Sequence, residues 1–148
     1  MFELLDAALG EGSILLNQEA STVAECFTLA GNALEVSGRT TPEYTFEMIE
    51  VFNELGPYMV IAPNIALAHA RPGSNVISTG LSLVTLNKPV EFGSKKFDPV
   101  NIVIGLAAVD HDAHIDLMAE LSEFFMNVTN VNFLLQADEV GNVRALFR

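Results

Sequence analysis

The 148-residue chain has little cysteine and few basic residues, and both shortages exclude classes of function. Its single cysteine, Cys26, excludes an intrachain disulfide and favours a reducing compartment, the cytoplasm. Only 7 lysines and arginines stand against 19 aspartates and glutamates, which gives a formal net charge of −12 at pH 7. This excess of negative charge argues against nucleic acid and against anionic membrane surfaces as partners. It indicates instead a protein partner with a basic face.

The chain also lacks a long apolar run. No stretch approaches the roughly 18 to 20 uninterrupted apolar residues of a membrane span. The N-terminal segment "MFELLDAALGEG" has no basic region like that of a signal peptide. Half of the residues are nevertheless hydrophobic, which is enough to form a core without disulfides or metal ions. Because no repeat or linker interrupts the pattern, residues 1–148 are expected to form one domain.

Apolar spacing predicts that helices and strands alternate along the chain. A turn near Asn87–Lys88 is expected to separate the fourth strand from a short edge piece around Pro89. The alternation predicts an α/β fold with a mostly buried sheet. Helices are expected over residues 2–10, 21–38, 41–56, 111–126, 129–137 and 139–147, and strands over 13–17, 58–62, 64–69, 81–86 and 100–109.

Local signals support the helix boundaries. Thr22 and Glu25 have the spacing of a capping box at the start of the second helix. Thr41 is expected to cap the third helix, with Pro42 in its first position. In the fourth helix, the residues expected to face inward are Ile115, Met118, Leu121, Phe124 and Phe125.

All three histidines of the chain follow predicted strands. His69 ends the run "NIALAH", and His111 and His114 come shortly after "VNIVIGLAAV". This second run is rich in Val and Ile and is typical of a central strand buried on both faces. Sites of open α/β sheets lie beyond the strand ends. If the two strands are near neighbours in one sheet, His69 and His114 are expected to meet in one cleft.

The residues around His69 can support phosphoryl transfer. A neutral imidazole can attack phosphorus when a hydrogen bond to its other nitrogen holds the tautomer. The phosphoryl oxygens then need hydrogen-bond donors or positive charge. Arg71, His114 and the start of the helix after Asp110 can supply them. Because no glycine-rich phosphate loop is present, a phosphate donor carried by another protein fits better than a nucleotide.

Other interpretations of the same residues stay open at this level. His69 can equally be a hydrogen-bonded structural histidine, Arg71–Pro72 an exposed turn, and His114 a solvent-facing residue. The segment "DHDAH" also offers His111, Asp112 and His114 to a metal ion, as in a metal-dependent hydrolase. The HExxH pattern of such enzymes is absent.

Together, "APNIALAHARPG" and "GLAAVDHDAHIDLMAELSEFF" resemble the enzyme IIA domain of the phosphoenolpyruvate-dependent sugar phosphotransferase system (PTS), of the fructose/mannitol type. The resemblance covers nearly the whole chain, as one type 2 domain over residues 1–148, and is greatest to the branch that serves ascorbate-like substrates. It implies a mixed sheet flanked by helices on both sides. It also implies that the phosphocarrier protein HPr phosphorylates His69 and that His114 is the second active-site histidine. The phosphoryl group would then pass to a cysteine of enzyme IIB, with no metal or other cofactor.

A phosphocarrier of this kind serves the membrane permease, enzyme IIC, only indirectly. A regulatory module that signals through its phosphorylation state is the alternative. Two positions depart from the family pattern: Ala68 stands where proline commonly precedes the histidine, and Asn53, within the run Glu50 to Glu54, is nearest to an arginine of mannitol-type members. Arg71 is therefore expected to contact the phosphoryl group instead. The sequence does not specify the sugar, and its apolar content leaves room for a homodimer.

Overall fold

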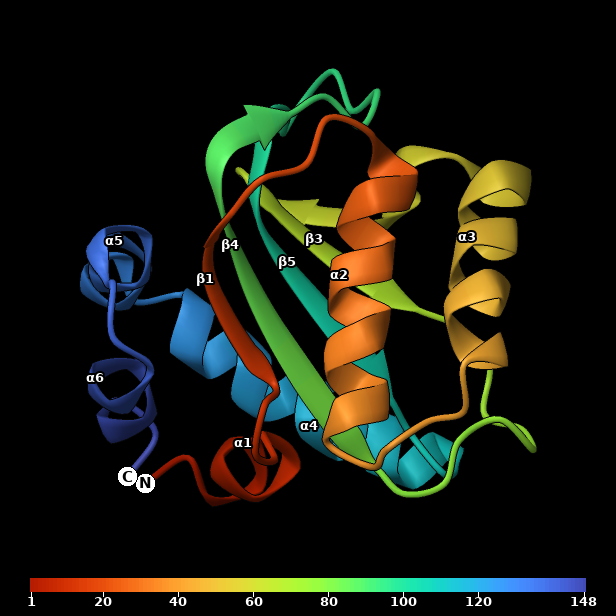
Figure 1. The fold of residues 1–148 in the computed structure, drawn as a ribbon. Helices are drawn as coiled ribbons and strands as arrows, with labels where there is room; N and C mark the ends of the chain where they lie inside the picture. Colours follow the sequence, from red (N-terminus) through yellow and green to blue (C-terminus); the bar gives the residue numbers. More distant parts are fainter.

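The computed structural model describes all 148 residues as one α/β domain around a five-stranded mixed sheet (Figure 1). Its strand order is β1-β4-β5-β3-β2, so β5 is central. The β1–β4 and β3–β5 pairs are parallel, whereas the β4–β5 and β2–β3 pairs are antiparallel. The strands are β1 (Ile14–Gln18), β2 (Val60–Ala62), β3 (Ile65–His69), β4 (Gly80–Val90) and β5 (Val100–Ala107).

Helices cover both faces of this sheet, with a separate buried apolar cluster under each layer (Figure 1). One layer consists of α2 (Val23–Val36) and α3 (Glu43–Leu55), followed by the short 3-10 helix η1 (Pro57–Met59). The other layer consists of α1 (Glu3–Ala8), α4 (His111–Phe125), α5 (Val128–Gln136) and α6 (Val140–Ala145). The prediction of one α/β domain with a mixed, mostly buried sheet flanked on both sides is confirmed.

The strand that carries His69 is buried on both faces. Ile65 and Leu67 belong to the cluster under α1 and α4–α6, whereas Ala66 and Ala68 belong to the cluster under α2 and α3. This alternation follows from the two-residue period of a strand. Ala68, at the position where the resemblance expects proline, is fully buried and in register with a residue of β5. His69 therefore stands at the first position where β3 leaves the core.

Two helix predictions are corrected by the structure. α3 begins at Glu43, with Pro42 at the N-cap position rather than in the first turn, and no side chain caps it. The Thr41 hydroxyl donates instead to Asn75 Oδ1 at 2.8 Å. In α4, Ile115 is half exposed and Leu117 is buried instead. The buried residues of α4 follow one helical stripe that packs against the sheet, and Ile115 lies outside it. The predicted cap of α2 is confirmed, since the Thr22 hydroxyl accepts the Glu25 N–H at 3.1 Å. The return contact of the capping box is shifted by one residue, because Glu25 Oε1 accepts the Ser21 N–H at 2.9 Å and not the Thr22 N–H.

Two strand predictions are also corrected. Residues 58–59 belong to η1, and only residues 60–62 form the short antiparallel strand β2. No turn occurs near Asn87–Lys88, because β4 continues to Val90, which pairs with Val100 of β5. Residues 87–89 are exposed, as the residues of a turn usually are, but their backbone remains extended.

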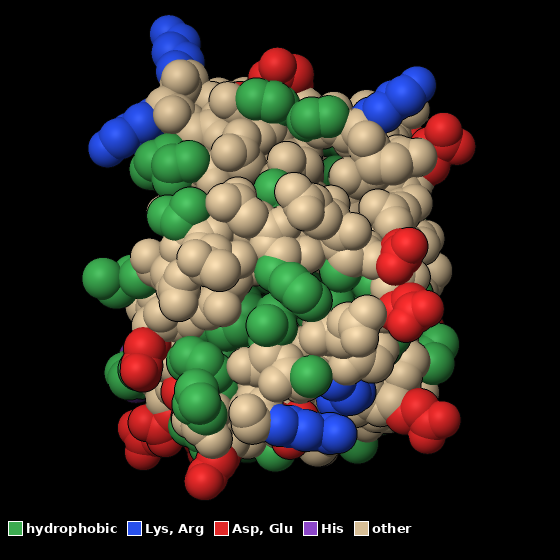
Figure 2. Space-filling view, turned by 90° about the vertical axis from the view of Figure 1, so that its left-hand side faces the viewer, with side chains coloured by type: hydrophobic (Ala, Val, Ile, Leu, Met, Phe, Trp, Pro, Cys, Tyr) green, Lys and Arg blue, Asp and Glu red, His purple; other side chains and the backbone are tan.

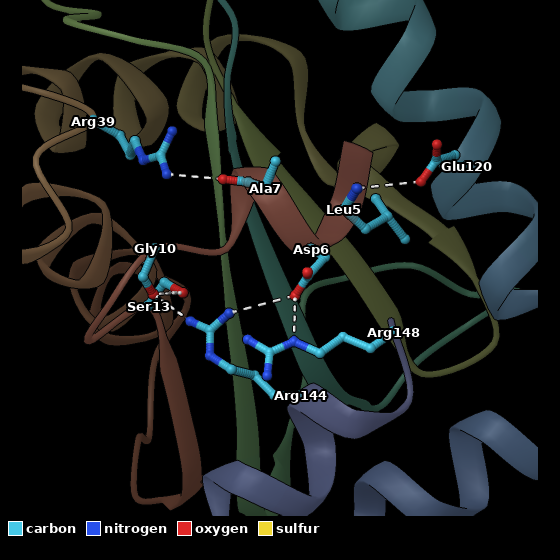
Figure 3. A network of polar contacts seen from close by, with 9 residues as sticks. All are labelled: Leu5, Asp6, Ala7, Gly10, Ser13, Arg39, Glu120, Arg144 and Arg148. Carbon is cyan, nitrogen blue, oxygen red and sulfur yellow. Dashed lines mark hydrogen bonds and ion pairs between the residues drawn. The ribbon is translucent and has the colours of Figure 1, made fainter. Parts of the chain in front are cut away.

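Polar contacts attach α1 to the C-terminal helices (Figure 3). Asp6 accepts a hydrogen bond from Arg148 at 3.3 Å and forms an ion pair with Arg144 at 3.9 Å. Arg144 also donates to the Gly10 carbonyl at 2.6 Å, and Arg39 donates to a backbone carbonyl of α1 at 3.0 Å. Three of the chain's 7 basic residues therefore hold the N-terminal helix in place.

The face that carries α5 and α6 presents dispersed hydrophobic side chains among polar atoms, with lysine and arginine near its rim (Figure 2). Val128 and Phe133 of α5 and Val140 of α6 are among the exposed apolar residues. None of the helices combines the length and the apolar character that a membrane crossing requires.

Candidate functional site

The topology of the sheet brings two histidines together at one strand end. His69 is the last residue of β3 and lies in parallel register with Leu106 of β5. The chain leaves β5 and enters α4 after three residues, which places His114 in the first turn of that helix. The ring centroids of His69 and His114 are 5.7 Å apart, with the ring planes inclined by 46°. The predicted meeting of the two imidazoles in one cleft is thus confirmed as a matter of geometry.

A backbone contact selects the tautomer of His69. The Nδ1 atom lies 3.0 Å from the carbonyl oxygen of Leu67. Because a carbonyl oxygen can only accept a hydrogen bond, Nδ1 must carry the proton. The neutral ring then has its lone pair on Nε2, the nitrogen on the opposite side from the backbone. The arrangement leaves one nucleophilic nitrogen on a half-buried imidazole.

His69 and His114 line an open cleft of about 590 Å³ at this end of the sheet. The edge of the Tyr58 ring approaches His69, with a centroid separation of 6.1 Å. The cleft lies between the N-terminal part of α4, the loop after β3 and one side of α3. Its lining residues are Glu47, Glu50, Val51, Glu54, Leu55, Tyr58, His69, Ala70, Arg71, Pro72, His111 and His114.

The charges around the cleft are mostly negative. Arg71 is its only lysine or arginine, and Glu47, Glu50 and Glu54 face it from α3. These glutamates follow a spacing of three and four residues, so they lie on one side of the helix. That spacing was visible in the sequence and could have identified the acidic row. Asn53 is exposed and does not line the cleft, so no side chain of α3 takes the place of the family arginine.

The surroundings of His114 favour its neutral form. Partial burial of the ring lowers the pKa of His114 below its ordinary value, and the nearby imidazoles of His69 and His111 lower it further. His111 is exposed but borders the same cleft, a role that sequence reasoning did not assign to it. The carboxylate of Asp110 caps α4 by accepting the Ala113 N–H at 2.8 Å. The Asp110 cap thus stabilises the first turn of the helix that carries His114 beside His69.

The metal-site interpretation finds no support in the arrangement of side chains. No group of three or more His, Cys, Asp or Glu side chains is placed to hold a metal ion. His111, Asp112 and His114 lie on the same turn of α4 but do not form such a group, although His69 lies near His114. Cys26 is buried in the opposite layer, and burial raises the pKa of its thiol to about 12, which leaves it without thiolate character at neutral pH.

Known proteins resemble this chain in sequence and in fold. The ascorbate-specific PTS system EIIA component of Escherichia coli (strain K12) is 40% identical over 112 residues, which are 76% of this chain and 73% of that protein. The mannitol-specific cryptic phosphotransferase enzyme IIA of Escherichia coli has a solution structure that superposes with a TM-score of 0.85, at 28% identity, over 97% of each chain.

A further solved structure contains a partner. It is the Escherichia coli complex of mannitol enzyme IIA with phosphorylated enzyme IIB, and it superposes with a TM-score of 0.82, at 27% identity, over 94% of this chain and 96% of that one. The family model described as "Phosphoenolpyruvate-dependent sugar phosphotransferase system, EIIA 2" matches residues 8–148. The chain therefore belongs to the type 2 enzyme IIA family of the phosphoenolpyruvate-dependent sugar phosphotransferase system.

Proposed function

We propose that this enzyme IIA accepts a phosphoryl group from phospho-HPr on His69 Nε2 and passes it to a cysteine of enzyme IIB. The observation that carries the proposal is the His69 ring itself. Its Nδ1 is held by the Leu67 carbonyl, which leaves Nε2 free, and the ring lies beside that of His114 in an open cleft. Such a fixed tautomer is what an attacking imidazole needs.

The two transfers together return His69 Nε2 to its original state. In the first, the Nε2 lone pair forms a bond to phosphorus while the phosphorus–nitrogen bond of the donor histidine breaks and the donor nitrogen keeps the electron pair. In the second, the enzyme IIB thiolate forms a bond to phosphorus and Nε2 recovers its electron pair. Nδ1 keeps its proton throughout, because its hydrogen bond to Leu67 is on the side away from the reaction.

His114 and Arg71 stabilise the phosphoryl group in this proposal. The short separation of the two rings allows His114 to donate a hydrogen bond to a phosphoryl oxygen. Arg71 supplies the single positive side chain of the cleft, opposite the acidic row of α3. Donors of this kind act where charge gathers during the in-line transfer of a phosphoryl group.

The net charge of the domain and its similarity to known enzyme IIA proteins support the proposed partners and substrate. A −12 domain is complementary to a carrier with a basic rim around its histidine, which suits HPr. The complex of a related enzyme IIA with phosphorylated enzyme IIB supports enzyme IIB as the acceptor. Kinship to ascorbate-specific components favours an ascorbate-like substrate, carried by the membrane permease enzyme IIC. With these partners, the proposed reaction is a cytoplasmic one. A homodimer stays a prediction, which light scattering on the purified protein tests.

Phosphorylation in a reconstituted system tests the proposal. The protein is incubated with phosphoenolpyruvate, enzyme I and HPr, and the uptake of one acid-labile, base-stable phosphoryl group is followed by mass spectrometry. His69→Ala should take up none, and Arg71→Ala should be phosphorylated more slowly. Continued uptake by His69→Ala would overturn the assignment of the nucleophile, and an unimpaired rate for Arg71→Ala would remove its role. Release of the group to purified enzyme IIB distinguishes a transport component from a purely regulatory module.

A further inference from the structure

A buried tyrosine of α3 holds the strand end that carries His69. Tyr44 lies in the first turn of α3, and its side chain is completely buried. Its hydroxyl oxygen accepts a hydrogen bond from the Ala70 N–H at 3.0 Å. The same hydroxyl lies 2.7 Å from the carbonyl oxygen of Leu106 and 3.3 Å from that of Ala70. One phenol thus contacts the backbone of two different strand ends.

The hydrogen-bonding capacity of a phenol determines how these contacts are shared. A hydroxyl has one proton to donate and can accept through its lone pairs. The Ala70 N–H uses a lone pair, and the proton is directed to Leu106, the nearer of the two carbonyls. The result is a bridge from the residue after His69 to the residue that lies opposite His69 on β5.

This bridge continues the β3–β5 ladder beyond its last backbone rung. β3 ends at His69, so the Ala70 N–H has no strand partner at that point, and the Tyr44 hydroxyl provides one. Burial raises the pKa of Tyr44 to about 12, so the phenol keeps its proton and remains a donor at neutral pH. The phenol therefore keeps the proton that the bridge requires at the pH at which phosphoryl transfer takes place.

We propose that Tyr44 is a positioning residue for the reaction at His69. By tying Ala70 to Leu106, it fixes the backbone on the C-terminal side of His69, while the Leu67 carbonyl fixes the ring from the N-terminal side. The two constraints hold in place the His69 ring, which lines the cleft beside His114. This inference rests on the proposed function, because it assigns to Tyr44 the alignment of the proposed nucleophile.

Tyr44→Phe is the direct test, because it removes the hydroxyl and keeps the ring in the core. Misplacing a reacting group by even an ångström costs up to about a hundredfold in rate. We expect the kcat for phosphorylation by phospho-HPr to fall by roughly ten- to a hundredfold with little change in KM. Nitrogen NMR of His69 should show the Nδ1-protonated tautomer losing population. A role in stability alone would lower the unfolding midpoint and leave the tautomer and the kcat of the folded protein unchanged.

A matched control lies next to Tyr44 on the same helix. The Thr45 hydroxyl is also buried but has no hydrogen-bond partner, so Thr45→Val removes a hydroxyl that holds no backbone group in place. Its kcat should equal that of the wild type. As a second variant, Ala70→Pro removes the N–H that the phenol accepts while keeping Tyr44, and it should reproduce the loss of kcat. Because proline also restricts the backbone of the preceding residue, His69, the informative result is an unimpaired kcat in Ala70→Pro, which would overturn the role even if Tyr44→Phe does not fold.

The outcomes separate this inference from the proposed function. Wild-type kcat and an unchanged His69 tautomer in folded Tyr44→Phe, or in folded Ala70→Pro, would overturn the positioning role and leave His69 as the nucleophile. Phosphate uptake by His69→Ala would instead overturn the proposed function and the inference with it. A selective fall in kcat in both bridge variants, with Thr45→Val unaffected, would establish the role.

Discussion

Phosphorylation of His69 is expected to reverse the electrostatic surroundings of His114. In the unmodified protein, partial burial and the two other imidazoles lower the pKa of His114. A phosphoryl group on His69 would add about one to two negative charges next to the same ring. Because an opposite charge favours the charged form of a titrating group, the pKa of His114 should rise when His69 is phosphorylated.

The separation of the two rings sets the size of this effect. At the centroid distance of 5.7 Å, and with an effective dielectric constant of about 40 for an open cleft, one negative charge attracts an imidazolium by about 1.5 kcal/mol. That energy corresponds to roughly a tenfold gain in the proton affinity of His114 for each unit of charge. A doubly charged phosphoryl group would therefore strengthen proton binding by up to about a hundredfold, less at high ionic strength.

Nitrogen NMR of the histidine side chains, recorded as a function of pH, measures this change. The titration of His114 is compared before phosphorylation and while phosphoenolpyruvate, enzyme I and HPr keep His69 phosphorylated. His111→Gln assigns the signals and removes one contributor to the lowered pKa. The titration midpoint of His114 should move to higher pH in the phosphoprotein. A midpoint that stays in place or moves lower would refute the assigned role of His114 as a phosphoryl contact.

The same coupling has a consequence for equilibrium. Because the phosphoprotein binds the His114 proton more tightly, lowering the pH through the raised pKa should favour the phosphorylated form. The phosphorylated fraction at equilibrium with phospho-HPr should then rise as the pH falls, relative to His114→Gln. Comparison of the two proteins at each pH cancels the titration of HPr itself.

Three further substitutions test the acidic cleft and the packing. Glu50→Gln should raise the equilibrium constant for phosphorylation by phospho-HPr by up to about fivefold, the effect of removing roughly 1 kcal/mol of repulsion. As a control, Glu123→Gln near the C-terminal end of α4 should leave this constant unchanged. Gly31→Ala places a methyl group against the Thr45 side chain where α2 meets α3, and urea titration should show a loss of about 1–3 kcal/mol in unfolding free energy. Thr22→Ala removes the cap of α2 and should cost about 1 kcal/mol in the same titration; an unchanged midpoint in either variant would contradict the packing or the cap.

Local sequence patterns predicted a helix or strand correctly where its structure depends only on residues close by in the chain. The Thr22 cap of α2 and the long apolar run of β5 were both predicted correctly, because each depends on residues that are neighbours in the chain. The predicted turn at Asn87–Lys88 was wrong for the opposite reason. There the polar side chains resemble a turn, but β4 continues until Val90 pairs with Val100 of the next strand, β5, and this keeps the backbone extended. Similarly, only packing against the sheet decides that Leu117 rather than Ile115 is buried.

For the site, the sequence by itself determined the ingredients: two histidine segments after two apolar strands, a single nearby arginine and a strongly acidic balance. Only the tertiary structure decided that β3 and β5 are adjacent and parallel, which brings His69 to 5.7 Å from His114. It also decided which nitrogen of His69 is free and that the hydroxyl of Tyr44 joins the two strand ends. These features depend on contacts between residues far apart in the chain, whose closeness is a property of the packed sheet and not of any local pattern.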